Sequence, residues 1–217
     1  MKKIDLKNLP SILPYKEYVA FVNDLMSHGA VSTKGTYSGI EMLQYTQYNM
    51  QVMARLDETT LLTQDTLTQL SQISKPITWL VLTEGWCGDA GQIVPVLEKM
   101  AQQNPNITHS ILLRDENLDI MDAFLTDGGR SIPKLVVLDA EGTVLASWGP
   151  RPQVLHKIVL QQKAKLQAMP KEDRKAYFNI VKKEVQAWYN EDETESIQRE
   201  VLEILPKSTE WGNLFPA

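Results

Sequence analysis

The residue most able to do chemistry in this sequence is Cys87, the single cysteine of the 217-residue chain. It lies in the stretch TEGWCGDAGQ, residues 83–92, where a β-rich apolar run gives way to a helical pattern. A cysteine at the N-terminus of a helix faces unpaired backbone N–H groups and the positive end of the helix dipole. Both favour the thiolate, the nucleophilic form of cysteine. The position predicts thiol chemistry at Cys87, with the backbone N–H groups of Gly88, Asp89 and Ala90 stabilising the charged sulfur.

Ala90 limits what this thiol can do. A Cys-x-x-Cys redox site would have its second cysteine at position 90, where this chain has alanine. In such a site the first thiolate attacks a substrate disulfide, and the second thiol then releases the product from the mixed disulfide. The sequence therefore excludes a self-contained dithiol cycle. It leaves a monothiol cycle, whose partners would be a protein or small-molecule disulfide or thiol and an external thiol reductant.

Composition and charge limit which other classes of partner the chain could bind. The chain is 43% hydrophobic and 23% charged, with a formal net charge of −5. This is a globular composition, mildly acidic and without basic clusters, so we expect no nucleic acid and no membrane as partner. The start of the chain, MKKIDLKNLPSILPYKEY, lacks the apolar run of a secretory signal, so we expect a cytoplasmic protein. His28, His109 and His156 show no metal-ligand spacing, and we expect neither a metal nor a cofactor.

The elements that would position Cys87 lie in residues 76–165. The patterns predict strands at 77–84, 107–113, 134–139 and 143–149, and helices at 87–103, 117–129 and from 152 onward. The first two strands are joined through a helix and should be parallel, whereas the last two are joined by a short hairpin and should be antiparallel. The fold class expected is α/β, a mixed sheet flanked by helices.

Helical extensions flank this predicted core. Residues 1–75 predict three helices, and residues 166–217 predict two more. These helices are amphipathic, so their apolar faces must be buried against something. They could cover one face of the core or form a homodimer interface. We therefore divide the chain into an N-terminal extension (1–75), a core (76–165) and a C-terminal extension (166–217).

The order of the core elements, with WCGDA directly after the first strand and SIP directly before the third, resembles the thioredoxin fold. The segment RDENLDIMDAFLTDGGRSIPKLVVLD is similar to cytoplasmic bacterial thioredoxin-family proteins with helical extensions. The resemblance implies that the Ile132–Pro133 bond is cis and packs near Cys87, exposing the backbone of Ile132 to an incoming extended peptide. Trp86 would offer a flat apolar surface beside the sulfur. We therefore expect Trp86, Ile132 and Pro133 to bind the substrate.

The charges around the thiol depart from the pattern of that family. Thioredoxins usually carry a buried acid six residues before the first cysteine, where this chain has Val81. The nearest acids are Glu84 and Asp89, and an anion close to a thiol raises its pKa. Lys134 would offset Asp89 if its side chain pointed toward the sulfur. The sequence leaves the direction of the net pKa shift open.

Two functions follow from these residues. The first, towards which we lean, is an enzyme: a thioredoxin-like monothiol oxidoreductase. Its Cys87 thiolate attacks a disulfide or an oxidised thiol, and an external thiol resolves the mixed disulfide. The second is a redox-inactive binding module of the same fold, in which Cys87 is a relic and the groove beside Pro133 accepts an extended peptide. Exposure and pKa of the thiol distinguish the two.

Overall fold

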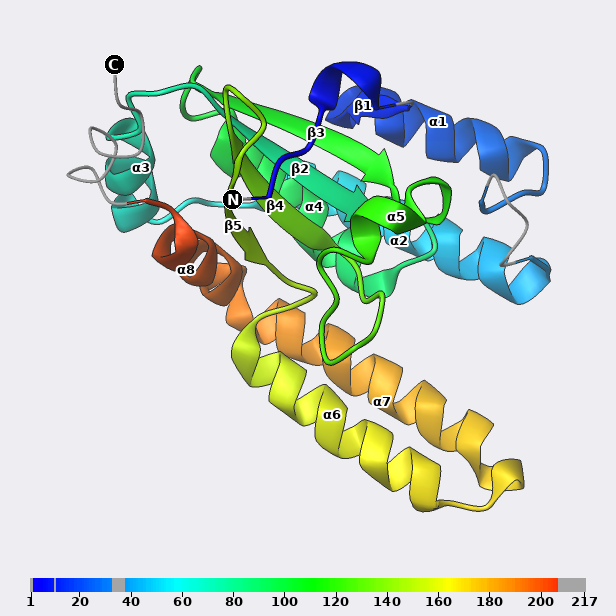
Figure 1. Cartoon of the computed structure of the whole chain (residues 1–217). Helices are drawn as coiled ribbons and strands as arrows, with labels where there is room; N and C mark the ends of the chain where they lie inside the picture. The colour runs from blue at the N-terminus through cyan, green and yellow to red at the C-terminus, as the bar shows by residue number, and fades with distance from the viewer. Residues whose placement is uncertain (1, 10, 33–37, 207–217) are drawn as a thin grey trace.

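The structure is a computed structural model that describes residues 2–9, 11–32 and 38–206 of the chain (Figure 1). A central sheet of five strands is flanked by helices, with the strand order β1-β3-β2-β4-β5. Within the residues described, no helix combines the length and apolar character that crossing a bilayer requires. The predicted α/β class with a mixed, thioredoxin-like sheet is confirmed.

Four of the strands lie where the sequence predicts them. The parallel pair is β2 (Ile77–Thr83) and β3 (Ile107–Leu113). The antiparallel hairpin is β4 (Lys134–Asp139) and β5 (Val144–Trp148), and β4 also runs antiparallel to β2. Strand β2 is therefore central, and its C-terminal end delivers the chain to the turn that carries Cys87.

Two elements differ from the sequence-based prediction. Strand β1 (Ile12–Pro14) was not predicted; it pairs antiparallel with β3 at the sheet edge. Three residues are too short a run to show periodicity, so their pairing depends on the exposed edge of β3. Helix α5 is only Leu118–Met121, shorter than the predicted 117–129, because the chain turns back in a tight bridge between Thr126 and Gly129.

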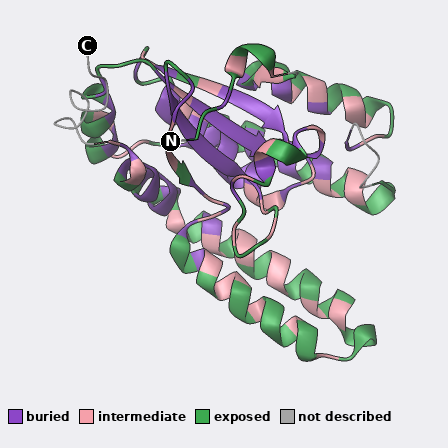
Figure 2. Ribbon diagram, viewed as in Figure 1, coloured by how far each residue is buried: buried purple, intermediate pink, exposed green. Residues whose placement is uncertain are grey.

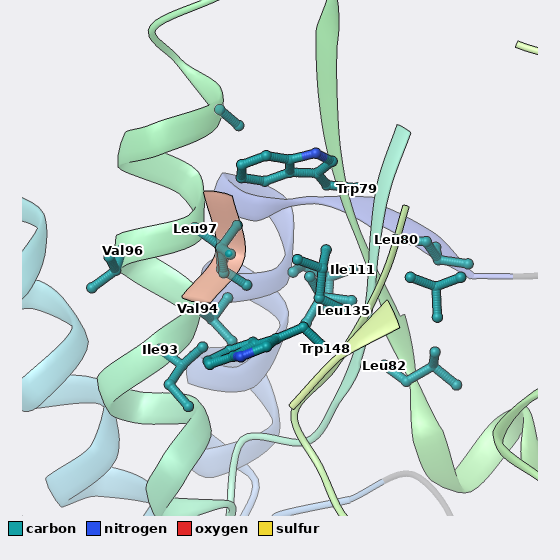
Figure 3. Packing of buried hydrophobic residues seen from close by; sticks show 14 of the residues in the cluster. Trp79, Leu80, Leu82, Ile93, Val94, Val96, Leu97, Ile111, Leu135 and Trp148 are labelled. Atoms are coloured by element: carbon teal, nitrogen blue, oxygen red, sulfur yellow. The ribbon is translucent and has the colours of Figure 1, made fainter. Parts of the chain in front are cut away.

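The sheet and its main helix form one packed core. Trp79 and the three residues after it in β2 are completely buried, which explains why this strand reads as an uninterrupted apolar run. Figure 2 shows the same burial along the neighbouring strands. Helix α4 (Gly88–Ala101) contributes Leu97 to this packed cluster, together with Trp79 of β2 (Figure 3). Because α4 is held by this core, the position of its N-terminus is fixed.

The remaining helices come from the two ends of the chain. They are α1 (Tyr15–Ser27), α2 (Ile40–Thr59) and α3 (Gln64–Ser71) before the core, and α6 (Gln153–Ala168), α7 (Lys171–Asp192) and α8 (Glu195–Ile204) after β5. Short 3-10 turns occur at Leu6–Asn8 and Arg114–Glu116. Helix α2 packs along α4, and β1 extends the sheet, so segments before residue 76 contact the core directly. The division of the chain at residues 75 and 165 stays a prediction.

Helices α6 and α7 form a helical hairpin, called the arm below, that projects from the sheet (Figures 1 and 2). Its surface is mostly exposed or half-buried, and the buried residues of its two helices are Leu155 and Tyr189. Beyond the arm, α8 turns back toward β5 and buries Ile197 and Val201. The arm is therefore anchored at its base, near Tyr189.

Candidate thiol site

Cys87 lies at the N-cap of α4, directly after the turn that follows β2. Its backbone N–H donates to the Glu84 carbonyl at 3.1 Å, and its own carbonyl accepts from Gly91 N–H at 3.2 Å. The first hydrogen bond closes the turn between strand and helix, and the second starts the helical ladder. The local sequence thus places the sulfur at the helix N-terminus, with the strand and the helix both anchored in the core.

The fold brings Cys87 to Ile132 and Pro133, which lie just before β4. The Cys87 thiol donates to the Ile132 carbonyl, with 3.2 Å between sulfur and oxygen. The Ile132–Pro133 peptide bond is cis. Trp86 is half-buried beside the thiol turn, and the Arg114 guanidinium lies 4.9 Å from the centre of its ring. Trp86 therefore lies on the thiol turn, and Ile132 and Pro133 form the segment that faces it. These are the three residues that the sequence analysis assigned to substrate binding.

Burial decides the protonation state of the thiol. Cys87 is 8% exposed, and burial raises its pKa to about 12, with the negative charge of Asp89 as the next cause. The backbone N–H groups of Ala90 and Asp89 and the positive charge of Arg151 act in the opposite direction. The helix N-terminus does favour the thiolate, as the sequence predicts, but desolvation outweighs it. In this conformation the sulfur is a protonated thiol.

Asp89 connects the thiol turn to the C-terminal part of the chain. Its carboxylate accepts hydrogen bonds from Arg151 Nε at 3.0 Å and from the Tyr189 hydroxyl at 2.8 Å. We call these three residues the Asp89 latch. Arg151 lies directly before Pro152, the N-cap of α6, and Tyr189 lies near the end of α7. No sequence motif marks either residue, because only the tertiary structure brings them to Asp89.

Lys134 does not compensate Asp89. Its ammonium donates to Thr126 Oγ1 at 2.6 Å and to the Gly149 carbonyl at 2.8 Å, so its hydrogen bonds are made to the loop and to the end of β5. Burial lowers the pKa of this lysine. Arg151 takes the compensating role that the sequence allowed for Lys134.

Side chains of both extensions close around the start of α4. A Cβ atom on Gly88 would lie 3.8 Å from Gln186 Nε2 of α7 and 4.0 Å from Asn49 Oδ1 of α2. Asn49 Nδ2 also donates to the Gly85 carbonyl at 3.0 Å, which fixes α2 against the thiol turn. Gln186 accepts a hydrogen bond from Gln92 on α4. The extensions therefore cover the N-terminal end of α4 on the side of Gly88.

A buried acid is present, although at a different position from the one that the resemblance implies. Val81 is completely buried, and Glu84 is 3% exposed with its carboxylate accepting from Asp115 N–H at 2.8 Å. Burial raises the pKa of Glu84 to about 7. Tyr18 of α1 is completely buried close to both Glu84 and Cys87, and burial raises the pKa of its hydroxyl. The sequence shows Glu84 near the thiol, but its burial depends on α1 and on the turn after β3.

Comparison with known proteins shows which family the sequence matches. The model of a family described as thioredoxin matches residues 40–167, more than half of the 217-residue chain. A Streptomyces coelicolor protein named "Putative thioredoxin 2" is 32% identical over 81 residues, which is 37% of this chain. The match covers 58% of the length of that relative.

Solved structures share the fold at low identity. A protein of unknown function from Pseudomonas aeruginosa is 20% identical with a TM-score of 0.53, covering 88% of this chain and 96% of that one. An HIV epitope-scaffold is 19% identical with a TM-score of 0.52, covering 88% of this chain and 97% of that one. At this coverage the likeness extends beyond residues 76–165 into the helical extensions.

Proposed function

The chain belongs to the thioredoxin family, and on that premise we propose that it is a monothiol thiol–disulfide oxidoreductase with Cys87 as the nucleophile. Family membership supports a redox role in general terms. The observation that carries the finer proposal is the position of the sulfur, at the N-cap of α4 and 3.2 Å from the carbonyl of Ile132 before a cis proline. A binding module of the same fold would share this placement, so turnover must distinguish the two functions.

The reaction proceeds by two exchanges of sulfur. The Cys87 thiolate attacks one sulfur of a substrate disulfide, a bond forms between the two sulfurs, and the second substrate sulfur leaves as a thiolate that takes up a proton. An external thiolate then attacks Cys87 Sγ and releases the first substrate sulfur as a thiol. A second external thiolate then attacks the sulfur of the first external thiol. This frees Cys87 as a thiolate and forms the disulfide of the external reductant. The substrate disulfide is reduced, and two external thiols are oxidised.

Ile132 would orient the substrate chain. In the resting protein its carbonyl accepts the thiol hydrogen of Cys87. When the thiol ionises, that carbonyl loses its donor and becomes available to an N–H group of an extended substrate. Trp86 provides an apolar surface on the same turn. Ionisation of Cys87 and binding of the substrate backbone are therefore coupled through one oxygen atom.

Reaction requires the buried Cys87 sulfur to become accessible to the substrate. Burial is the largest cause of the raised pKa, and the N–H groups of Asp89 and Ala90 already favour the thiolate. Water reaching the sulfur would remove the first effect and leave the second. Exposure of the sulfur to water, with Arg151 still paired with Asp89, would convert the protected thiol into a nucleophile, and we expect a docked substrate to trigger it.

The second candidate is a binding module that has lost its redox chemistry. It is favoured by the burial of Cys87 and by its pKa of about 12, since a reactive cysteine is normally accessible and acidified. In this function the segment at Ile132 would still accept an extended peptide, without covalent chemistry.

Turnover distinguishes the two functions. Reduction of a soluble aryl disulfide by excess reduced glutathione would be followed with the wild-type chain and with Cys87→Ser as the matched variant. An oxidoreductase reduces the disulfide at least about tenfold faster than Cys87→Ser, and the wild type carries a mixed disulfide at Cys87 when the external thiol is omitted. Equal rates for both chains, with no adduct, would leave the binding module as the function.

A further inference from the structure

The arm carries an excess of positive charge in an acidic protein. Residues 153–183, which form α6 and the first part of α7, hold eight of the 22 Lys and Arg residues of the chain but only two of its 27 Asp and Glu residues. The formal net charge of the whole chain is nevertheless −5, so the rest of the molecule is strongly acidic. This basic segment projects from the sheet (Figure 1), where it can attract a partner of negative charge.

Most of the cations in this segment have no counter-charge within the protein. Lys175 and Lys182 contact α2, and Arg174 donates to backbone carbonyls at the turn between α6 and α7. The other five are exposed and make no hydrogen bond or ion pair with any residue that the structure describes: Lys157, Lys163, Lys165, Lys171 and Lys183. These ammonium groups are therefore available to carboxylates of another molecule.

Helix α6 places two of these lysines on either side of an exposed leucine. Lys157, Leu160 and Lys163 are spaced by three residues, so they follow one another along the same side of the helix. Leu160 is 42% exposed, and α6 contains neither Asp nor Glu. This outer face of α6 offers an apolar side chain between two ammonium groups. It suits a polypeptide segment that carries both apolar and acidic side chains.

A nucleic acid or an anionic membrane fits the arm less well than a protein does. Both present negative charge continuously over a surface larger than the arm, so they would also meet the acidic remainder of the molecule. Recognition of phosphate also favours arginine, whereas seven of the eight cations of residues 153–183 are lysines. An acidic protein segment presents its charge locally and can bind the arm alone.

The same helix begins beside the candidate thiol site. His156 precedes Lys157 directly, and its Nε2 lies 2.9 Å from Asp127 Oδ2. Asp127 lies shortly before Ile132, whose carbonyl accepts the thiol hydrogen of Cys87. The start of α6 is thus held against the segment that faces the sulfur. A polypeptide whose disulfide reaches Cys87 can therefore contact the outer face of α6 as well.

We propose that the outer face of α6 is the docking surface for an acidic segment of a protein substrate. Its carboxylates pair with Lys157 and Lys163, and an apolar side chain between them packs on Leu160. The identity of this partner as the substrate rests on the oxidoreductase function proposed above. Docking holds the substrate beside the buried thiol and raises its local concentration there. The substrate class is then proteins that carry an acidic segment near their disulfide.

Docking is tested first without sulfur chemistry. Two fluorescein-labelled peptides of equal length, both free of cysteine, differ only in carrying glutamate or glutamine on either side of a leucine. Fluorescence anisotropy measures their affinity for the full-length chain. We expect the glutamate peptide to bind at least about tenfold more tightly at about 20 mM sodium chloride, and most of this difference to disappear at about 0.5 M, because salt screens exposed charges.

Charge reversal locates the surface. Lys157→Glu combined with Lys163→Glu should weaken binding of the glutamate peptide about tenfold or more, since attraction becomes repulsion. Lys3→Glu combined with Lys16→Glu is the matched control, because it changes the net charge equally at exposed positions outside the arm. This control should bind within about twofold of the wild type. Leu160→Ala should weaken binding about two- to fivefold by removing apolar contact area.

The link to Cys87 is tested with the same two peptides carrying a cysteine in a disulfide with thionitrobenzoate. Attack of the Cys87 thiolate on the peptide sulfur forms the Cys87–peptide disulfide and releases thionitrobenzoate as a coloured thiolate, while the thiol proton passes to the buffer. The glutamate peptide should react at least about tenfold faster than the glutamine peptide, and the double variant of α6 should remove this difference. Selective binding without release would contradict the redox function and leave the docking surface in place.

Three results would overturn the docking surface, whether or not Cys87 reacts. These are equal affinity for the two peptides, equal losses in the two double variants, or tighter binding of duplex DNA or phosphatidylserine vesicles than of the glutamate peptide. The last result would assign the arm to a different class of partner.

Discussion

The sheet core and the arm are built by different interactions. The core buries whole strands, with Trp79 and the three residues after it in β2 completely inaccessible. The arm buries only Leu155 and Tyr189 from its two helices, and it meets α2 through polar pairs such as Lys175 with Glu41. The core therefore fixes where Cys87 lies, whereas the base of the arm supplies Tyr189, which together with Arg151 binds the neighbouring Asp89. The predictions below test whether the arm also affects the reactivity of the thiol.

The largest effect on the free energy of unfolding is expected when the same substitution, leucine to alanine, is compared in the core and in the arm. Leu97→Ala in α4 removes a completely buried side chain and should lower the free energy of unfolding by about 2–5 kcal/mol. Leu160→Ala in α6 changes a side chain that is 42% exposed and should cost less than about 0.5 kcal/mol. Urea denaturation of both variants measures the difference. Similar losses would mean that the arm is part of the cooperative core.

The pH dependence of alkylation tests whether burial controls the thiol. Because the pKa of Cys87 in the folded chain is raised to about 12, the alkylation rate of the native protein should rise continuously with pH, without a plateau below about pH 10. The same chain in denaturant should show a midpoint near the free-cysteine value of about 8.5. A native midpoint below that of the denatured chain would show that the helix N-terminus outweighs burial.

Glu84 should make the free energy of unfolding depend on pH. Its pKa is raised from 4.5 to about 7 by burial, so the folded state holds the proton more tightly than the unfolded state. Its contribution is complete below about pH 4.5 and is lost as pH rises through 7, which corresponds to about 3 kcal/mol.

Glu84→Gln keeps the acceptor for Asp115 N–H and removes the titration. This variant should be more stable than the wild type at pH 8 and should lose most of the slope between about pH 4.5 and 7. Chemical denaturation between about pH 4.5 and pH 8 measures both effects, and Glu58→Gln on α2 serves as the surface control. An unchanged slope would place the pKa of Glu84 near its ordinary value.

A smaller effect is expected at the latch. Tyr189→Phe removes only the hydroxyl that donates to Asp89, so it should lower the free energy of unfolding by about 1 kcal/mol and raise the alkylation rate of Cys87 several-fold. Tyr177→Phe is the matched control, because the Tyr177 hydroxyl bonds Gln162 within the arm and does not contact the thiol turn. Equal alkylation rates for the two variants would remove the latch from control of Cys87.

The smallest effect is expected where the arm meets α2. Lys175 and Glu41 form an ion pair at 2.6 Å, but their side chains are 74% and 61% exposed. Exposed ion pairs contribute little to stability. Lys175→Met should therefore leave the melting temperature within error of the wild-type value. A clear loss would show that the arm is held along its length and not at its base.

Local pattern was sufficient for most of the fold. The apolar runs at β2 and β3, the hairpin of β4 and β5, and the helix starting after Cys87 all lie where the sequence predicts them. Strand β1 was missed because three residues carry no periodic signal, and α5 was predicted too long because the turn from Thr126 to Gly129 forms through a local bridge. The expected roles of the site residues stay predictions, although Cys87, Trp86, Ile132 and Pro133 do cluster around the thiol turn.

The sequence by itself determined the chemical limits of this protein: one thiol, a helix N-terminus to hold it, and no second thiol at position 90, where the chain has Ala90. These follow from residue identity and from local hydrogen bonding, which neighbouring residues dictate. Only the tertiary structure decided the state of that sulfur. Its burial and the pairing of Asp89 with Arg151 and Tyr189 both depend on contacts between distant segments. Desolvation is a property of the whole packed environment, so no local sequence pattern predicts whether the pKa of the thiol is raised or lowered.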